Sequence, residues 1–87
     1  MTKRTIITLD QIKRLETEFM ELFKDFRPQP QVQEDIEIYK RIKPALNYRR
    51  LMIKNEGNKH EKHYRTRMYN EMVHSLPALR FYLKNKQ

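Results

Sequence analysis

Large apolar residues recur at helical spacing through the first third of the chain. Between residues 9 and 26 they follow one another at intervals of three and four, which is the repeat of one face of an α-helix. The face contains Ile12, Leu15, Phe19, Leu22 and Phe26, with Leu9, Met20 and Phe23 beside it. Thr8 is placed to cap this helix, because Gln11 follows three residues later in the pattern of a capping box. We predict a helix that begins at Leu9 and ends by Phe26.

This apolar face has two interpretations. Five seam positions over two heptads match half of a dimeric coiled coil, although three or four sustained heptads are typical of that structure. Met20 and Phe23 make the face broader than a seam, which favours packing against two neighbours in a bundle. We expect core packing and keep the five residues as the candidate oligomer or partner face.

A second apolar stripe begins near Val32 and predicts a second helix. At 100° per residue its members fall within about one third of the helix circumference. They are Val32, Ile36, Tyr39, Ile42, Leu46 and Ile53. Pro44 interrupts the segment without disturbing the stripe, so we expect either one long helix kinked at Pro44 or two helices, the second with Pro44 in its first turn. Gly57 marks the end, since glycine adopts a left-handed conformation at low cost.

Helical spacing resumes after Gly57. A third helix is predicted from about Asn58 to His74, and Ser75 and Pro77 predict the start of a short last helix up to Leu83. The inner face of the third helix contains Tyr64, Met68, Tyr69, Met72, Val73 and Leu76.

These elements predict the fold class. A single glycine and the lack of hairpin-turn signals argue against a sheet protein. We predict an all-α fold, a small bundle of three to four helices with a proline-rich break after the first helix and a kink or break near Pro44. Residues 1–87 are expected to form a single helical domain, with a flexible arm at 1–8 and a flexible tail at 84–87.

Length and composition exclude several functional classes. A chain of 87 residues buries a small core and has little room for a deep active-site cleft. The absence of cysteine excludes a disulfide scaffold, a thiolate zinc site and a cysteine nucleophile. There is no glycine-rich phosphate loop and no Ser/His/Asp arrangement. We therefore expect a non-enzymatic protein with no cofactor and no small-molecule substrate.

The apolar runs are short. None approaches the roughly 18–20 residues that cross a bilayer, and the segment from Thr5 to Thr8 is too short for the hydrophobic region of a signal peptide. We expect a soluble, cytoplasmic protein that does not act at a membrane.

The net charge of +8 comes from one stretch of the chain. Residues 1–39 have six basic and eight acidic residues, residues 40–67 have ten and two, and residues 68–87 have three and one. Lys and Arg neutralise phosphates, and the interleaved tyrosines offer stacking surfaces for bases. The candidate nucleic-acid-binding residues are Lys40, Arg41, Lys43, Arg49, Arg50, Lys54, Lys59, His60, Lys62, His63, Arg65 and Arg67.

The segment around Gly57 does not match a helix-turn-helix motif. That motif needs a small residue four positions before its glycine and apolar residues six and nine positions after it, so that two helices cross closely. Here these positions hold Ile53, His63 and Thr66.

The three histidines are not expected to bind a metal. His60 and His63 are close in sequence, but His74 lies roughly 16–21 Å further along a straight helix at about 1.5 Å per residue. Two ligands are too few for a zinc site.

Two hypotheses of different classes follow. The first is a small nucleic-acid-binding regulator whose middle segment contacts the phosphates of DNA or RNA. A homodimer is one form that this regulator could take. The alternative is a protein-binding adaptor or inhibitor, of the kind that a mobile element encodes, which binds through the first helix or uses the basic surface to bind an acidic protein.

Overall fold

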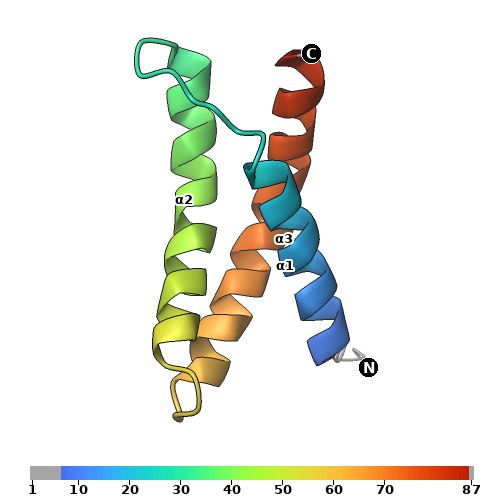
Figure 1. The fold of residues 1–87 in the computed structure, drawn as a ribbon, viewed down its shortest axis with the longest axis vertical. Coiled ribbons are helices and arrows are strands. Elements are labelled where there is room, and N and C mark those ends of the chain that lie inside the picture. The colour runs from blue at the N-terminus through green and yellow to red at the C-terminus, as the bar shows by residue number, and fades with distance from the viewer. Residues whose placement is uncertain (1–6, 87) are drawn as a thin grey trace, which may run out of the picture.

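A computed structural model describes residues 7–86 and contains three helices (Figure 1). They are α1 (Leu9–Phe23), α2 (Gln33–Lys54) and α3 (Glu61–Lys86). α1 and α2 both pack against α3, whereas no Cα atom of α1 lies within 8 Å of one in α2. The predicted all-α class and the helical bundle are confirmed, since residues 7–86 contain no strand. Most of the predicted N-terminal arm lies outside the described residues, and α3 includes most of the predicted C-terminal tail.

The start of α1 is fixed by its cap. The Thr8 hydroxyl oxygen accepts a hydrogen bond from the Gln11 N–H at 3.2 Å, and the Gln11 Oε1 accepts one from the Thr8 N–H at 2.9 Å. This reciprocal pair satisfies backbone donors that a helix start leaves without intrahelical partners. The predicted capping box and the predicted start at Leu9 are confirmed.

α1 ends at Phe23, before the prolines of the connector. The Arg27 guanidinium donates to the backbone carbonyls of Lys24 and Phe26, which lie where the helical hydrogen bonds stop. Phe26 then turns into the core, where its ring meets the Tyr82 ring edge-on at a centroid distance of 5.4 Å. Residues 24–32 link α1 to α2, and this segment includes exposed Pro28 and Pro30.

The two later prolines lie inside continuous helices. α2 has 22 residues and contains Pro44, so the long-helix alternative is correct and the predicted break is absent. α3 has 26 residues and contains Pro77, so the predicted separate last helix is wrong. The Ser75 hydroxyl donates to the Glu71 carbonyl at 2.7 Å, a bond within the helix rather than a cap. A proline inside a helix destabilises that helix by about 3 kcal/mol. Burial of neighbouring side chains such as Ala45 and Leu76 in the core offsets this loss.

The core is formed by all three helices and Phe26. Its buried apolar residues are Ile12, Phe19, Phe26, Ile42, Ala45, Met68, Met72, Leu76, Leu79 and Tyr82. Three of the five residues on the predicted α1 face are among them, while Leu15 and Leu22 are half-buried against the core. The α1 face therefore packs within this single chain.

The buried face of α2 is rotated relative to the predicted stripe. Ile42 is fully buried as expected, but Tyr39 and Ile53 are 41% and 50% exposed, and Ala45 is buried instead. No Cα atom of α1 lies within 8 Å of one in α2, so the flank of the stripe that a second close helix would cover stays open. On α3, Val73 was also predicted to face the core, but it is 42% exposed.

A buried carboxylate joins the start of α2 to the end of α3. Asp35 is 1% exposed and accepts hydrogen bonds from the Tyr82 hydroxyl and from the Gln29 N–H, the latter at 2.8 Å. Burial and the hydrogen bond to Asp35 raise the pKa of Tyr82 from 10 to about 12. Sequence periodicity gave no sign of this pair, because an aspartate in a first helical turn is ordinarily exposed.

Replacement of Tyr82 by phenylalanine is expected to lower the free energy of unfolding by about 1–3 kcal/mol at neutral pH, because Asp35 loses a buried donor. The raised pKa means that the folded state holds the phenolic proton more strongly than the unfolded state does. The stabilising contribution of Tyr82 is therefore complete below pH 10 and is lost as the pH rises towards 12. Denaturant titrations should show the difference between wild type and Tyr82→Phe shrinking over this range.

The control for this prediction is Tyr69→Phe. Tyr69 is also on α3 and is half-buried against the core. The free energy of unfolding of this variant at neutral pH should differ little from that of wild type. A Tyr82→Phe deficit that stayed constant between pH 8 and pH 12 would contradict the proposed role of the phenolic proton.

Candidate nucleic-acid interface

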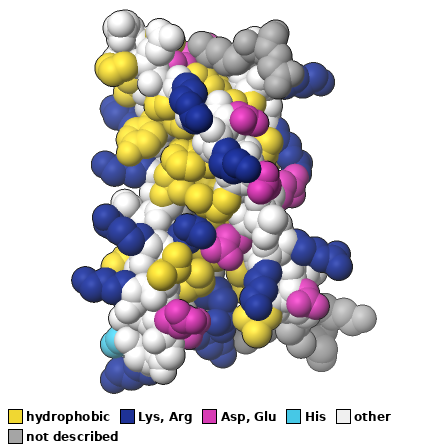
Figure 2. Space-filling model, viewed as in Figure 1, with side chains coloured by type: hydrophobic (Ala, Val, Ile, Leu, Met, Phe, Trp, Pro, Cys, Tyr) yellow, Lys and Arg dark blue, Asp and Glu magenta, His cyan; other side chains and the backbone are white. Residues whose placement is uncertain are grey.

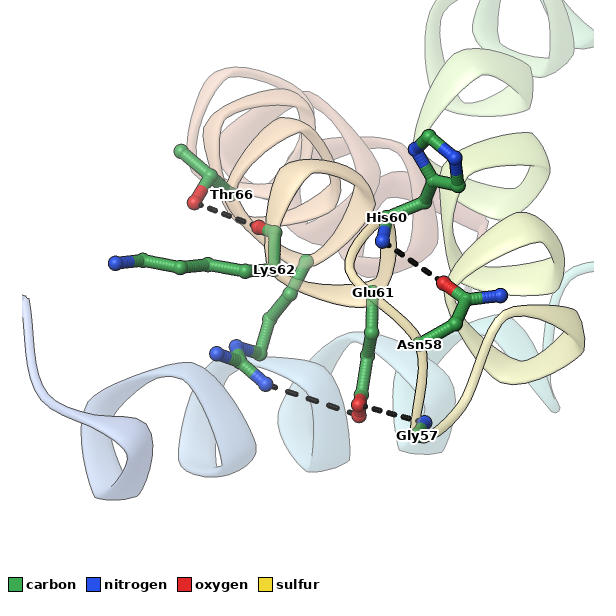
Figure 3. A network of polar contacts seen from close by, with 7 residues as sticks. Gly57, Asn58, His60, Glu61, Lys62 and Thr66 are labelled. Atoms are coloured by element: carbon green, nitrogen blue, oxygen red, sulfur yellow. Dashed lines mark hydrogen bonds and ion pairs between the residues drawn. The ribbon is translucent and has the colours of Figure 1, made fainter.

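α2 and α3 form a hairpin whose turn is held by short-range hydrogen bonds (Figure 3). The Gly57 N–H donates to Glu61 Oε1 at 3.0 Å, and the His60 N–H donates to Asn58 Oδ1 at 2.8 Å. The Asn58 amide also donates to Asn55 Oδ1 at 3.1 Å. α3 therefore begins at Glu61, three residues after the predicted start, because residues 58–60 belong to the turn.

Gly57 has a φ of +87°, the left-handed conformation predicted for it. An added Cβ would meet no atom within 4 Å, so only the backbone conformation disfavours a side chain here. Gly57→Ala is expected to lower the free energy of unfolding by about 1–2 kcal/mol. Gly57→Asn should lose less, because asparagine tolerates this conformation better. Thermal melts of the two variants test this ranking, and equal losses would contradict it.

Five polar residues form a row along the outer face of α2, at successive intervals of three, four, three and four. This α2 row contains Lys40, Lys43, Asn47, Arg50 and Lys54. All five side chains are exposed. The row is about 21 Å long, at about 1.5 Å per residue. In Figure 2, Lys and Arg side chains follow the left edge of the molecule, where Figure 1 places α2.

A second group lines a shallow depression on the first half of α3. This α3 cluster contains Lys59, Lys62, His63, Thr66, Arg67 and Asn70. All six residues are exposed. The cluster adjoins the turn, so Lys59 lies five residues from Lys54 at the end of the α2 row.

Two of the predicted contact residues are engaged within the chain. The Arg49 Nε lies 2.7 Å from Glu16 Oε2 and ties α2 to α1, and both side chains are largely buried. The Arg65 guanidinium lies 3.7 Å from the Glu61 carboxylate one turn away. Among residues 7–86 none of the four ion pairs involves the other eight predicted Lys and Arg residues.

The remaining predicted residues occupy other positions. His60 is exposed within the turn. Arg41 is exposed too, but it lies about 100° or more around α2 from every member of the row. Two of the tyrosines expected to offer stacking surfaces contact each other instead: the rings of Tyr48 and Tyr64 lie 6.4 Å apart between the helices. The structure therefore places eight of the twelve predicted residues on the α2 row and the α3 cluster, four on each.

Three polar residues of these surfaces were missed by the sequence analysis, which considered charge and aromatic content. Asn47 lies in the middle of the α2 row, and Thr66 and Asn70 line the α3 depression. The three-four spacing of Asn47 with its polar neighbours Lys43 and Arg50 was the available signal for Asn47.

Comparison with protein-family models, curated proteins and solved structures gives no match. Within the part of the chain that the structure describes, no three His, Asp or Glu side chains gather to hold a metal ion. No helix among residues 7–86 combines the length and the apolar character needed to cross a bilayer. The two cationic surfaces are thus the features on which a functional proposal can rest.

Proposed function

We propose that the protein binds nucleic acid and that the α2–α3 hairpin contacts the phosphates. The supporting observation is a set of exposed cations without ion-pair partners among residues 7–86, on the α2 row and the α3 cluster. They are Lys40, Lys43, Arg50, Lys54, Lys59, Lys62 and Arg67.

The physical basis is electrostatic. Like charges gathered on one hairpin repel one another, and a polyanion relieves this repulsion. Each phosphate that a Lys or Arg neutralises releases condensed counterions from the nucleic acid, which favours binding at low salt. Only two of the eleven acidic residues, Glu56 and Glu61, lie within residues 40–67, which contain ten Lys and Arg residues.

A binding titration at two salt concentrations tests this proposal. Fluorescence anisotropy of a labelled 20-base-pair duplex is measured at 50 and 200 mM KCl. With six or seven phosphate contacts, the affinity should fall by roughly a thousandfold or more between the two conditions. No binding to DNA or RNA at low salt, or binding that salt does not weaken, would refute the proposal.

An acidic protein is the alternative ligand for the same exposed Lys and Arg residues. The other surface considered for an adaptor, the α1 face, is largely used by the core, where Ile12, Phe19 and Phe26 are buried. Capture from lysate with and without nuclease separates the two classes. Partners that remain after nuclease treatment, and that salt releases, favour the adaptor.

A further inference from the structure

The α2 row differs from a merely charged surface in the order of its residues. Cations stand at both ends, at Lys40 and Lys54, and an amide stands at the centre, at Asn47. We infer that α2 enters the major groove of B-form DNA, with Asn47 and Arg50 at base edges and the terminal lysines at phosphates. This inference rests on the proposed nucleic-acid binding and specifies the class of nucleic acid.

The position of α2 in the fold permits this docking. Among residues 7–86, α3 is the only helix whose Cα atoms come within 8 Å of α2. The ion pair of Arg49 with Glu16 of α1 is on the side of α2 away from the row. The centre of the row lies about 150° around the helix from the buried pair Ile42 and Ala45. In Figure 1, α2 forms one edge of the molecule along its whole length. The outer half of the helix is therefore free to protrude into a groove.

The dimensions of the row fit a groove. A helix with side chains is about 10–12 Å wide, and the major groove of B-DNA is about 12 Å wide. The major groove of an A-form RNA duplex is too narrow for side chains to read. Recognition of single strands relies on aromatic faces that stack on bases, and Tyr48 and Tyr64 instead face each other between α2 and α3. Duplex DNA is therefore the favoured ligand.

The central residues have the chemistry that base edges require. An asparagine side chain can donate from its amide N–H to adenine N7 and accept at Oδ1 from the adenine N6 amino group, and an arginine can donate twice to guanine, at O6 and N7. Asn47 and Arg50 are exposed, and among residues 7–86 neither side chain takes part in a hydrogen bond. Both remain available to a ligand.

The first arm of the test is site selection from a random duplex DNA pool, followed by selection with Asn47→Ala. Wild type should enrich a short preferred site. Asn47→Ala should lose discrimination at one base pair by roughly 5- to 150-fold, the range for a single bidentate contact. The matched control is Asn85→Ala, which removes an exposed asparagine near the end of α3, outside the α3 cluster. Wild type that enriches no site, or an Asn47→Ala profile equal to that of wild type, would overturn the inference.

The second arm identifies the groove. Dimethyl sulfate methylates guanine N7 in the major groove and adenine N3 in the minor groove, so one reagent probes both. Methylation at guanine N7 within the selected site should block binding. Interference confined to adenine N3 would overturn the inference, as would equal affinity for duplex RNA or single-stranded DNA.

These outcomes are separable from a failure of the proposed function. A protein that binds no nucleic acid at 50 mM KCl refutes both proposals. A protein that binds duplex RNA and duplex DNA equally, with steep salt dependence, retains phosphate binding and loses the role assigned to α2. Circular dichroism of each variant confirms that its helices are intact, as expected for exposed positions.

Discussion

Replacement of Phe19 by aspartate is expected to unfold the chain. Phe19 is 0% exposed and lies in the core formed by all three helices. Loss of a buried phenylalanine side chain costs about 3–5 kcal/mol, and burial of an unpaired carboxylate adds several more. A small domain has only about 5–15 kcal/mol of stability in total. The far-ultraviolet circular dichroism signal at 25 °C should therefore fall to that of an unfolded chain.

The matched control is Leu9→Asp, the same type of change in the same helix at a residue that is 53% exposed. Its stability should change by less than about 0.5 kcal/mol. Light scattering tests the alternative that the apolar face of α1 is the seam of a dimer. A Phe19→Asp variant that kept its helical signal while the particle mass halved would show a dimer seam rather than a core.

Removal of two cations from the α2 row is expected to weaken binding and its salt dependence together. In Lys43→Ala/Lys54→Ala, two phosphate contacts are lost, so the slope of log affinity against log salt should fall in magnitude by about two. The affinity at 50 mM KCl should fall on the order of a hundredfold. Anisotropy titrations of one duplex at several salt concentrations measure both quantities.

The control for this double variant removes the same net charge from another helix. Lys13 and Arg14 are exposed on α1, outside the hairpin. Lys13→Ala/Arg14→Ala should keep most of the affinity, because only charges near the phosphates contribute fully at physiological screening. Equal losses in the two double variants would mean that affinity follows net charge alone, and the hairpin would lose its assignment.

The sequence predicted helix starts and turns correctly where a single local interaction or backbone conformation determines them. The start of α1 depends on the Thr8 and Gln11 pair, which lies within four residues of sequence. The turn at Gly57 depends on one backbone conformation. Such features need no knowledge of the rest of the fold.

Helix continuity at the prolines was harder to predict, because it depends on contacts that are distant in sequence. Pro77 and its neighbour Ser75 have the composition of a helix start, yet buried neighbours hold α3 together through them. The orientation of α2 depends on which helices pack closely against it, and periodicity alone does not reveal that no Cα atom of α1 comes within 8 Å of α2.

For the candidate site, the sequence predicted the segment but not its division into surfaces. Charge counting located the cations within residues 40–67. It did not distinguish Arg49 from its neighbour Arg50. Arg49 pairs with Glu16, which lies 33 residues earlier, whereas the Arg50 side chain is exposed. It also passed over Asn47, since an uncharged residue adds nothing to a net charge.

The hydrogen bond between Asp35 and Tyr82 has a consequence for ligand binding. The turn at Gly57 joins α2 and α3 at one end of the hairpin, and this buried bond joins them at the other (Figure 1). Splaying of the two helices would break this buried hydrogen bond, so we expect the spacing between the α2 row and the α3 cluster to change little when a ligand binds. A polyanion that matches this spacing then binds with little loss of conformational entropy from the protein.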